Sequence, residues 1–190
     1  MKMTFRWYGE EDRIPLSHIA QIPGVDGVVT AVYDVPVGEV WPVEKLRRLR
    51  ALSESHGLSM EVIESIPVHE DIKLGRPTRD AYIEAYRKNI LACGAVGVKC
   101  VCYNFMPVFD WLRTDLHYRH ADGSESLAYS EAALRSLDPH HLRLPGWDES
   151  YREDELNALL SAYSGMSHET LFENLVYFLH GVRPACREAG

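Results

Sequence analysis

The sequence has few cysteines, a shortage of positive charge and no long hydrophobic run, and each shortage excludes a class of protein. Its 4 cysteines form no CxxC pair and no disulfide framework, so we expect reduced thiols. Acidic residues outnumber basic ones 28 to 20, and the net charge of -8 argues against a nucleic-acid or membrane partner. No apolar stretch approaches the roughly 18 residues of a membrane span, and MKMTFRWYGEED turns acidic too early for a signal peptide. These features predict a cytoplasmic protein.

What the chain does contain is an alternation of strand-like and helical patterns. Apolar residues recur every three positions from Val43 to Leu52, and Gly57 follows where a helix C-cap glycine is common. Thr78 and Ser167 are candidate N-caps for two later helices. This rhythm predicts βα units and a parallel sheet. The expected strands are residues 4–8, 25–32, 59–65 and 96–105, and the expected apolar face of the last helix is Leu171, Leu175, Phe178, Leu179 and Val182.

Residues 106–166 interrupt the rhythm. The stretch has several prolines and short polar segments, with one small helical pattern around Leu156, Leu159 and Leu160. Because about 60 residues is too long for a simple connection, we interpret it as an insertion or cap. The rest has the pattern of an α/β protein of the TIM (β/α)8 barrel family, containing only the first four or so βα units, with residues 1–190 as the N-terminal part of the barrel domain.

The predicted strands end in polar and aromatic residues. In a barrel of this type the chemistry lies at the carboxyl ends of the strands. Those ends favour a site for a polar small molecule, although the pattern by itself has low specificity. The ends are Trp7-Tyr8-Gly9, Tyr33-Asp34, Glu64-Ser65 and Tyr103-Asn104-Phe105.

Two long motifs of unusual composition carry a family resemblance. ESIPVHEDIKLG at 64–75 and VCYNFMPVFDWLRTDL at 101–116 resemble mannonate dehydratases, and RWYG at 6–9 and FENLVYFLHGVRPACREAG at 172–190 are similar to the same family. The resemblance covers essentially the whole chain, and it matches only the first half of the family's barrel. We therefore expect a truncated chain that is inactive alone.

The resemblance implies a metal-dependent sugar-acid lyase of the xylose-isomerase-like superfamily. The family removes water from D-mannonate to give 2-keto-3-deoxy-D-gluconate in hexuronate catabolism, with Fe²⁺ or Mn²⁺ stabilising the developing enediolate. The family's metal ligands are histidines, a cysteine and an aspartate on strands of the second half. No metal ligand is therefore assigned here, and a homo-oligomer is expected.

Three polar residues near the strand ends are candidates for substrate binding. Asn104 could hydrogen-bond a sugar hydroxyl, or it could simply form a turn. Glu64 follows a strand that should be buried, so its carboxylate must be paired or take part in chemistry. His69 lies in the loop after that strand, where a solvent-exposed histidine is the commonest alternative.

Trp7 and Arg113 are further substrate candidates. Trp7 could form an apolar wall beside the sugar chain, or it could pack in the core. Arg113 could bind the substrate carboxylate through two hydrogen bonds, or it could pair with Asp110 and fix the loop. Cys100 and Cys102 point to one face of their strand and are expected to be buried thiols. The histidines of the insertion are interpreted as surface residues: His117, His120, His140 and His141.

Two other functions stay open. A metal-dependent sugar isomerase or epimerase of the same superfamily would have similar strand ends. A naturally truncated chain with a binding or regulatory role would have no catalytic function.

Overall fold

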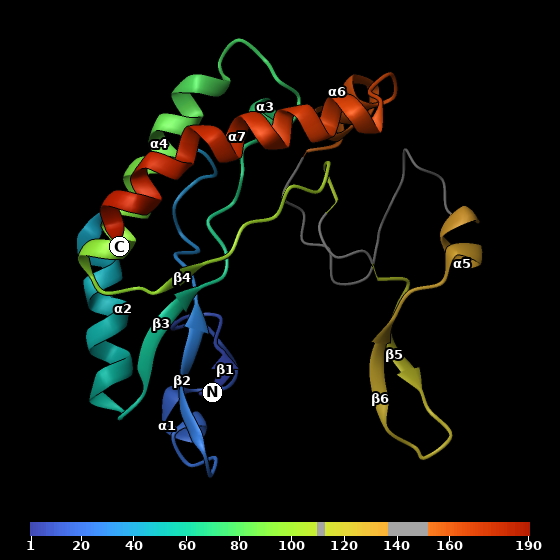
Figure 1. The fold of residues 1–190 in the computed structure, drawn as a ribbon. Helices are drawn as coiled ribbons and strands as arrows, with labels where there is room; N and C mark the ends of the chain where they lie inside the picture. The colour runs from blue at the N-terminus through green and yellow to red at the C-terminus, as the bar shows by residue number, and fades with distance from the viewer. Residues whose placement is uncertain (110–112, 137–151) are drawn as a thin grey trace. The chain divides into compact units, whose positions relative to one another are not determined.

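The computed structural model describes residues 1–109, 113–136 and 152–190. The chain forms two compact units, one made of residues 1–105 and 168–190 and the other of residues 106–167. The first unit contains a four-stranded sheet and the second a two-stranded sheet (Figure 1). None of the helices in these ranges is long and apolar enough to cross a membrane.

The larger unit is a parallel sheet with the strands in chain order. The four strands pair as β1-β2-β3-β4, and each pair is parallel. Parallel neighbours need a crossover between them, which the intervening helices supply. The strands are β1 (Met3–Arg6), β2 (Val25–Thr30), β3 (Ser59–Ile63) and β4 (Cys100–Val101).

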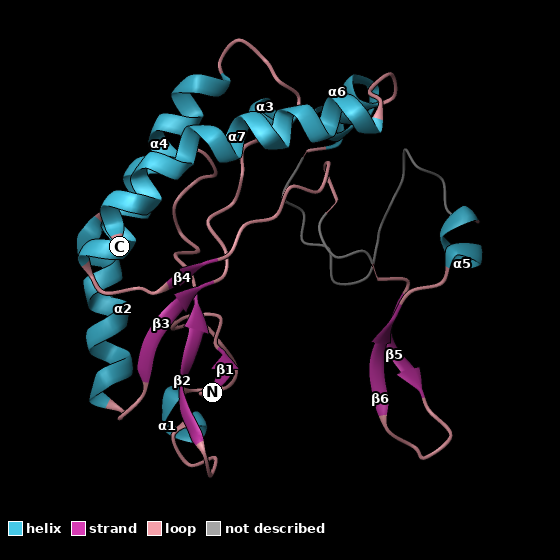
Figure 2. Ribbon diagram, in the orientation of Figure 1, coloured by secondary structure: helices cyan, strands magenta, loops and turns pink. Residues whose placement is uncertain are grey.

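Helices lie along one side of this sheet, as Figure 2 shows for α2, α4 and α7. The helices of this unit are α1 (Leu16–Ile19), α2 (Val43–Ser55), α3 (Glu70–Lys73), α4 (Arg79–Ala95) and α7 (His168–Ala189). Gly57 has a φ of 74° just after α2, a conformation that glycine adopts without steric cost. The expected helix end at Gly57 is therefore confirmed.

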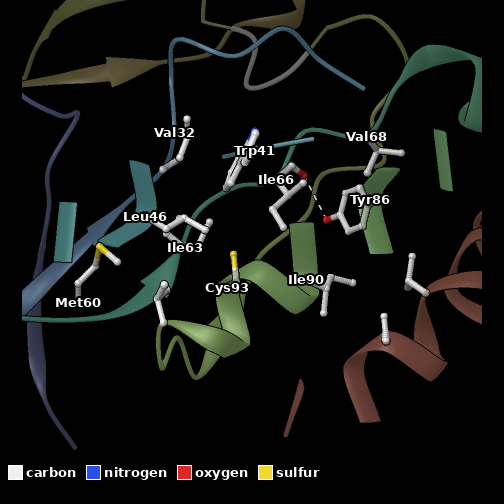
Figure 3. Packing of buried hydrophobic residues seen from close by; sticks show 14 of the residues in the cluster. Val32, Trp41, Leu46, Met60, Ile63, Ile66, Val68, Tyr86, Ile90 and Cys93 are labelled. Carbon is white, nitrogen blue, oxygen red and sulfur yellow. Dashed lines mark hydrogen bonds between the residues drawn. The ribbon is translucent and has the colours of Figure 1, made fainter. Parts of the chain in front are cut away.

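The hydrophobic core fills the space between the sheet and the helices. Leu46, Met60 and Ile63 are at most 1% exposed, and Trp41 packs close to them (Figure 3). Tyr86 donates a hydrogen bond to the carbonyl of Ile66, which satisfies its buried hydroxyl (3.2 Å). Burial raises the pKa of the Cys93 thiol in this core to about 12, so the group is an inert thiol.

The last helix, α7, is fixed by one aromatic residue and one amide. Phe178 is 0% exposed and meets the rings of Tyr86, Tyr103 and Phe105 at centroid distances of 4.9, 5.7 and 5.8 Å. Asn174 donates a hydrogen bond to the carbonyl of Lys73 at the end of α3 (2.9 Å). Segments separated by about a hundred residues in the chain are thereby joined.

The described residues of the smaller unit form a hairpin and two helices. β5 (Asp115–Arg119) pairs antiparallel with β6 (Glu125–Ala128), and Gly123 in the connecting turn has a φ of 86°. The helices are α5 (Glu131–Arg135) and α6 (Glu153–Tyr163). α6 lies where the leucine pattern predicted a helix, whereas the hairpin was not expected. His140, His141, Asp110 and Trp111 lie outside the described residues.

Several expectations about individual residues were wrong. Thr78 occupies the N-cap position of α4, but its hydroxyl donates to Asp71 (2.5 Å) and does not cap the helix. Cys100 is exposed, because it lies on the sheet face away from the helices. Leu179 was expected on the apolar face of the last helix but is 38% exposed, whereas the polar residue Asn174 of α7 is buried. The fourth strand spans two residues, shorter than the predicted 96–105.

Candidate active site at the carboxyl ends of the strands

The strand register gives the sheet two different faces. Thr30 of β2 lies beside Ile63 of β3, and both are 0% exposed under the helices. The next row consists of Arg6, Val29, Val62 and Cys100, which pair across the four strands. Side chains of paired residues in a parallel sheet point to the same face. Since Cys100 is exposed and its row neighbours are half-buried, this row belongs to the open face of the sheet.

An ion pair between Arg6 and Glu64 lies at the carboxyl end of the open face. Arg6 Nη1 is 3.0 Å from Glu64 Oε2, with side chains 29% and 43% exposed. The Arg6 guanidinium also lies over the ring of Tyr8, 5.0 Å from its centroid. Glu64 therefore has the charged partner that the sequence required, and the partner comes from the first strand.

Two tyrosines extend this group across β1 and β2. The rings of Tyr8 and Tyr33 have centroids 6.1 Å apart. Burial raises the pKa of the Tyr33 phenol, and the positive charge of Arg6 opposes that rise. Tyr33 is therefore a neutral hydrogen-bonding group at neutral pH.

The thiol of Cys102 joins the group from the end of β4. Burial raises the pKa of the Cys102 thiol, the neighbouring Cys100 and Glu64 raise it further, and Arg6 opposes them. A neutral thiol is a weak nucleophile. We call Arg6, Tyr8, Tyr33, Glu64 and Cys102 the strand-end cluster, and it draws on all four strands of the sheet.

His69 occupies a different place, in the loop between β3 and α3. Its Nδ1 accepts a hydrogen bond from the backbone N–H of Asp71 and so caps α3 (3.1 Å). Its ring lies against Tyr82, with centroids 3.6 Å apart and planes 10° apart. Burial lowers the pKa of His69, although the nearby carboxylates Asp71 and Glu70 oppose the shift. A neutral imidazole of this kind keeps Nε2–H as a donor.

A small cavity lies beside His69. Its volume is about 10 Å³, and its walls include Tyr82, Tyr86 and Asn89. A space of this size holds about one water molecule and is too small for a sugar acid. Asn89 fixes one wall, since it accepts from Trp41 N–H (2.7 Å) and donates to the Glu39 carbonyl (3.0 Å). Asn89 therefore supports the loop after β2, and the cavity beside it is no substrate pocket by itself.

The five predicted site residues are not all brought together. Glu64 lies in the strand-end cluster, and Asn104 is half-buried just after β4 in the same unit. Trp7 is 2% exposed and packs in the hydrophobic core, as the alternative interpretation expected. His69 caps α3, and Arg113 belongs to the smaller unit.

Sequence reasoning missed Arg6 as part of this site. Its neighbours Trp7 and Tyr8 were considered because they end the first strand, and Arg6 lies in the same RWYG motif. An arginine inside a β-strand, flanked by apolar residues, was a usable signal, since a charge there needs a partner. The identity of that partner depends on which strands are neighbours.

The described residues do not form a metal site. Within residues 1–109, 113–136 and 152–190, no three histidine, cysteine, aspartate or glutamate side chains are arranged to hold a metal ion. At the strand ends, Cys100 and Cys102 supply two thiols, and Glu64 supplies the carboxylate that acts on Cys102. The donor set therefore does not match the closed or open sites that iron, manganese or zinc adopt in proteins.

A parallel sheet with charged and phenolic groups at its carboxyl edge places the chain among α/β proteins whose ligand sites lie at the strand ends. The D-mannonate dehydratase family model matches residues 1–190, so the chain belongs to the D-mannonate dehydratase family. The expected resemblance is thereby confirmed.

Known proteins of this family are similar over the whole chain. The mannonate dehydratase of Streptococcus uberis is 51% identical over 192 residues, covering 100% of this chain and 55% of the relative. That of Streptococcus suis is 53% identical, covering 100% and 53%. The crystal structure of the mannonate dehydratase from Streptococcus suis serotype 2 matches with a TM-score of 0.90 at 49% identity, over 100% of this chain and 51% of that one. The chain spans about half the length of the curated relatives it matches.

Proposed function

We propose that this chain forms the first half of a (β/α)8 barrel that dehydrates D-mannonate to 2-keto-3-deoxy-D-gluconate in hexuronate catabolism. The observation that carries the proposal is the match of all 190 residues to the family, with similar backbone and about half of the residues identical. The open face of the sheet and its polar carboxyl end agree with a barrel interior. Residues 106–166, which fall within a separate compact unit, are the proposed insertion or cap.

The reaction removes a proton from the carbon beside the carboxylate and hydroxide from the neighbouring carbon, which together leave as water. Catalysis requires a base for the first group and an acid for the second. Glu64, kept next to the positive charge of Arg6, is the proposed acceptor of hydrogen bonds from substrate hydroxyls. Asn104, at the end of the neighbouring strand, is the proposed second contact.

Trp7, His69 and Arg113 complete the proposed substrate-binding residues. Trp7 contributes from the core by fixing the backbone between Arg6 and Tyr8, and its backbone N–H donates to the Val29 carbonyl (2.9 Å). His69 is proposed to act through Nε2, since Nδ1 already caps α3. Arg113 is the proposed contribution of the smaller unit.

The complete enzyme is proposed to be a cytoplasmic homo-oligomer that uses Fe²⁺ or Mn²⁺. A divalent metal supplies Lewis-acid stabilisation of developing negative charge. Its ligands are proposed to lie outside residues 1–190, because the family resemblance places them on strands of the second half.

The test uses a chimera in which residues 1–190 replace the matching half of the Streptococcus suis mannonate dehydratase. We expect the chimera, supplied with Mn²⁺ or Fe²⁺, to convert D-mannonate into the keto-deoxy acid without isomerising ketose substrates. A folded chimera that isomerises ketoses would instead favour the sugar isomerase alternative. A folded chimera with neither activity would favour a binding role for this chain.

A further inference from the structure

The guanidinium of Arg6 has more hydrogen-bonding capacity than its neighbours use. Arg6 Nη1 approaches Glu64 Oε2 at 3.0 Å, yet Nε and Nη1 are buried and make no hydrogen bond of good geometry within the described part of the chain. A guanidinium has five N–H donors in a planar fork. A ligand carboxylate at the exposed part of the side chain would therefore give this group an acceptor that the described part of the chain does not supply.

The surroundings of Arg6 hold this fork in a fixed orientation. Tyr8 lies under one face of the guanidinium and Glu64 contacts Nη1 at its edge. The backbone is fixed as well, because Arg6 is the last residue of β1 and pairs with Val29 of β2. The side chain is still 29% exposed, so part of it faces the open side of the sheet. A planar donor fixed in this way is preorganised for a planar acceptor.

Arg6 and Glu64 together match the chemistry of a sugar acid. A sugar acid carries one carboxylate and several hydroxyl groups, so it needs a bidentate donor beside a strong acceptor. Arginine is suited to bidentate recognition of carboxylates, and a glutamate accepts from hydroxyls. Tyr33 adds a neutral phenol to the same site, since burial keeps its pKa raised.

We infer that Arg6 binds the carboxylate of the sugar-acid substrate at the carboxyl end of β1, with Glu64 holding the guanidinium in place. The inference rests on the proposed function and goes beyond it, because it assigns the carboxylate to Arg6 and not to Arg113. Arg113 lies in the other compact unit, whereas Arg6 is itself part of the strand-end cluster.

The experiment measures equilibrium binding of D-mannonate and of the neutral analogue D-mannitol to the metal-depleted chimera, together with KM and kcat of the metal-loaded chimera. The variants are Arg6→Met, Arg6→Lys and Arg113→Met. The matched control is Arg48→Met, since Arg48 belongs to helix α2 and forms an exposed ion pair with Glu10 (2.8 Å).

We expect Arg6→Met to weaken D-mannonate binding about 10- to 100-fold and to raise KM similarly, while D-mannitol binding stays within about 3-fold. Arg6→Lys keeps the charge and loses the planar fork of donors, so its affinity for D-mannonate should lie between those of the parent chimera and Arg6→Met. Arg48→Met should match the parent chimera. If Arg6→Met does not fold, the comparison of Arg6→Lys with the parent decides the question.

Three results would overturn the inference. One is an Arg6 variant with unchanged D-mannonate binding, another is an equal loss for D-mannonate and D-mannitol, and the third is a selective loss in Arg113→Met alone. Failure of the proposed function looks different: the folded parent chimera would then produce no keto-deoxy acid, and both proposals would fall together.

Discussion

The imidazole of His69 lies flat against the ring of Tyr82, with centroids 3.6 Å apart, while its Nδ1 caps α3. Gly38 packs against both rings, and a Cβ atom there would come within 2.6 Å of Tyr82. The stack thus joins the loop after β2, the loop after β3 and helix α4. Protonation of His69 would replace the Nδ1 acceptor with a donor and break the cap.

The first prediction is a loss of stability in mild acid that depends on His69. Its pKa is lowered in the folded chain, chiefly because burial disfavours the charged ring. The unfolded chain therefore binds more protons once the pH falls below about 6.5, the ordinary histidine pKa. The free energy of unfolding should fall as the pH decreases from about 6.5 through the lower folded pKa, and it should be independent of this group at higher pH.

The variant that isolates this effect is His69→Asn, because asparagine can cap a helix and does not titrate. The measurement is urea unfolding of the 190-residue chain between pH 5 and 8, at concentrations where the midpoint is independent of concentration. We expect the parent chain to lose stability in acid relative to His69→Asn. Parallel pH profiles for the two proteins would contradict the assignment.

The second prediction compares two phenylalanines of α7. Phe178 is 0% exposed among three aromatic rings, whereas Phe172 is 64% exposed. Phe178→Ala should lower the free energy of unfolding by about 3–5 kcal/mol, because it removes buried area and leaves a cavity. Phe172→Ala should change it by less than about 0.5 kcal/mol. Equal effects in the same urea titration would mean that α7 does not dock through Phe178.

The sequence could predict the parts of the fold that have a regular local pattern. The parallel sheet and helix α2 follow from local patterns, such as apolar spacing and Gly57 after the helix. The β5–β6 hairpin was missed although Asp122-Gly123, a common turn pair, lies between its strands. Its strands are short and exposed, so they have little hydrophobic alternation to detect.

The strand-end cluster was predictable only in part. That Glu64 needs a partner follows from its position after an apolar strand. That the partner is Arg6 depends on strand register, and the register shifts between Met3 and Thr4 and again between Val28 and Val29. Irregularities of this kind have no clear mark in the sequence, so the pairing became visible only in the folded sheet.

The third prediction concerns two glycines with positive φ. Gly75 (φ 68°) and Gly57 (φ 74°) both disfavour other residues, but a Cβ at Gly75 would lie 2.7 Å from the Asn174 side chain, whereas that at Gly57 meets nothing. Gly57→Ala should lower the free energy of unfolding by about 1–2 kcal/mol through backbone strain. Gly75→Ala should lower it further, because it also disturbs the hydrogen bond from Asn174 to Lys73.

The control for this third prediction is Gly75→Ala combined with Asn174→Ala. Once Asn174 has been shortened, the added Cβ at Gly75 no longer meets its amide. The Gly75→Ala step should then lower the free energy of unfolding by the same amount as Gly57→Ala. If Gly75→Ala is equally harmful with and without Asn174, the side-chain contact plays no part, and backbone strain alone explains the loss.

The fourth prediction concerns the outer strands of the sheet. β1 pairs only with β2 and β4 only with β3 among the described strands, so both have unpaired backbone groups on one side. Unpaired edges of a parallel sheet invite pairing with other chains. We therefore expect the 190-residue chain alone to self-associate and to show no dehydratase activity with added Mn²⁺ or Fe²⁺.

A charge on the edge strand tests the cause of this self-association. Thr4 is exposed on β1, and Thr4→Lys should reduce association in sedimentation experiments, because lysines on edge strands oppose strand pairing. Ala51→Lys on the exposed side of α2 adds the same charge away from the edge and should have little effect. Equal reductions would attribute the result to net charge.

Addition of the separately expressed second half of the Streptococcus suis enzyme should suppress association and restore turnover, since it would supply both missing strand partners. A monomeric chain that turns over D-mannonate unaided would contradict the half-barrel proposal directly.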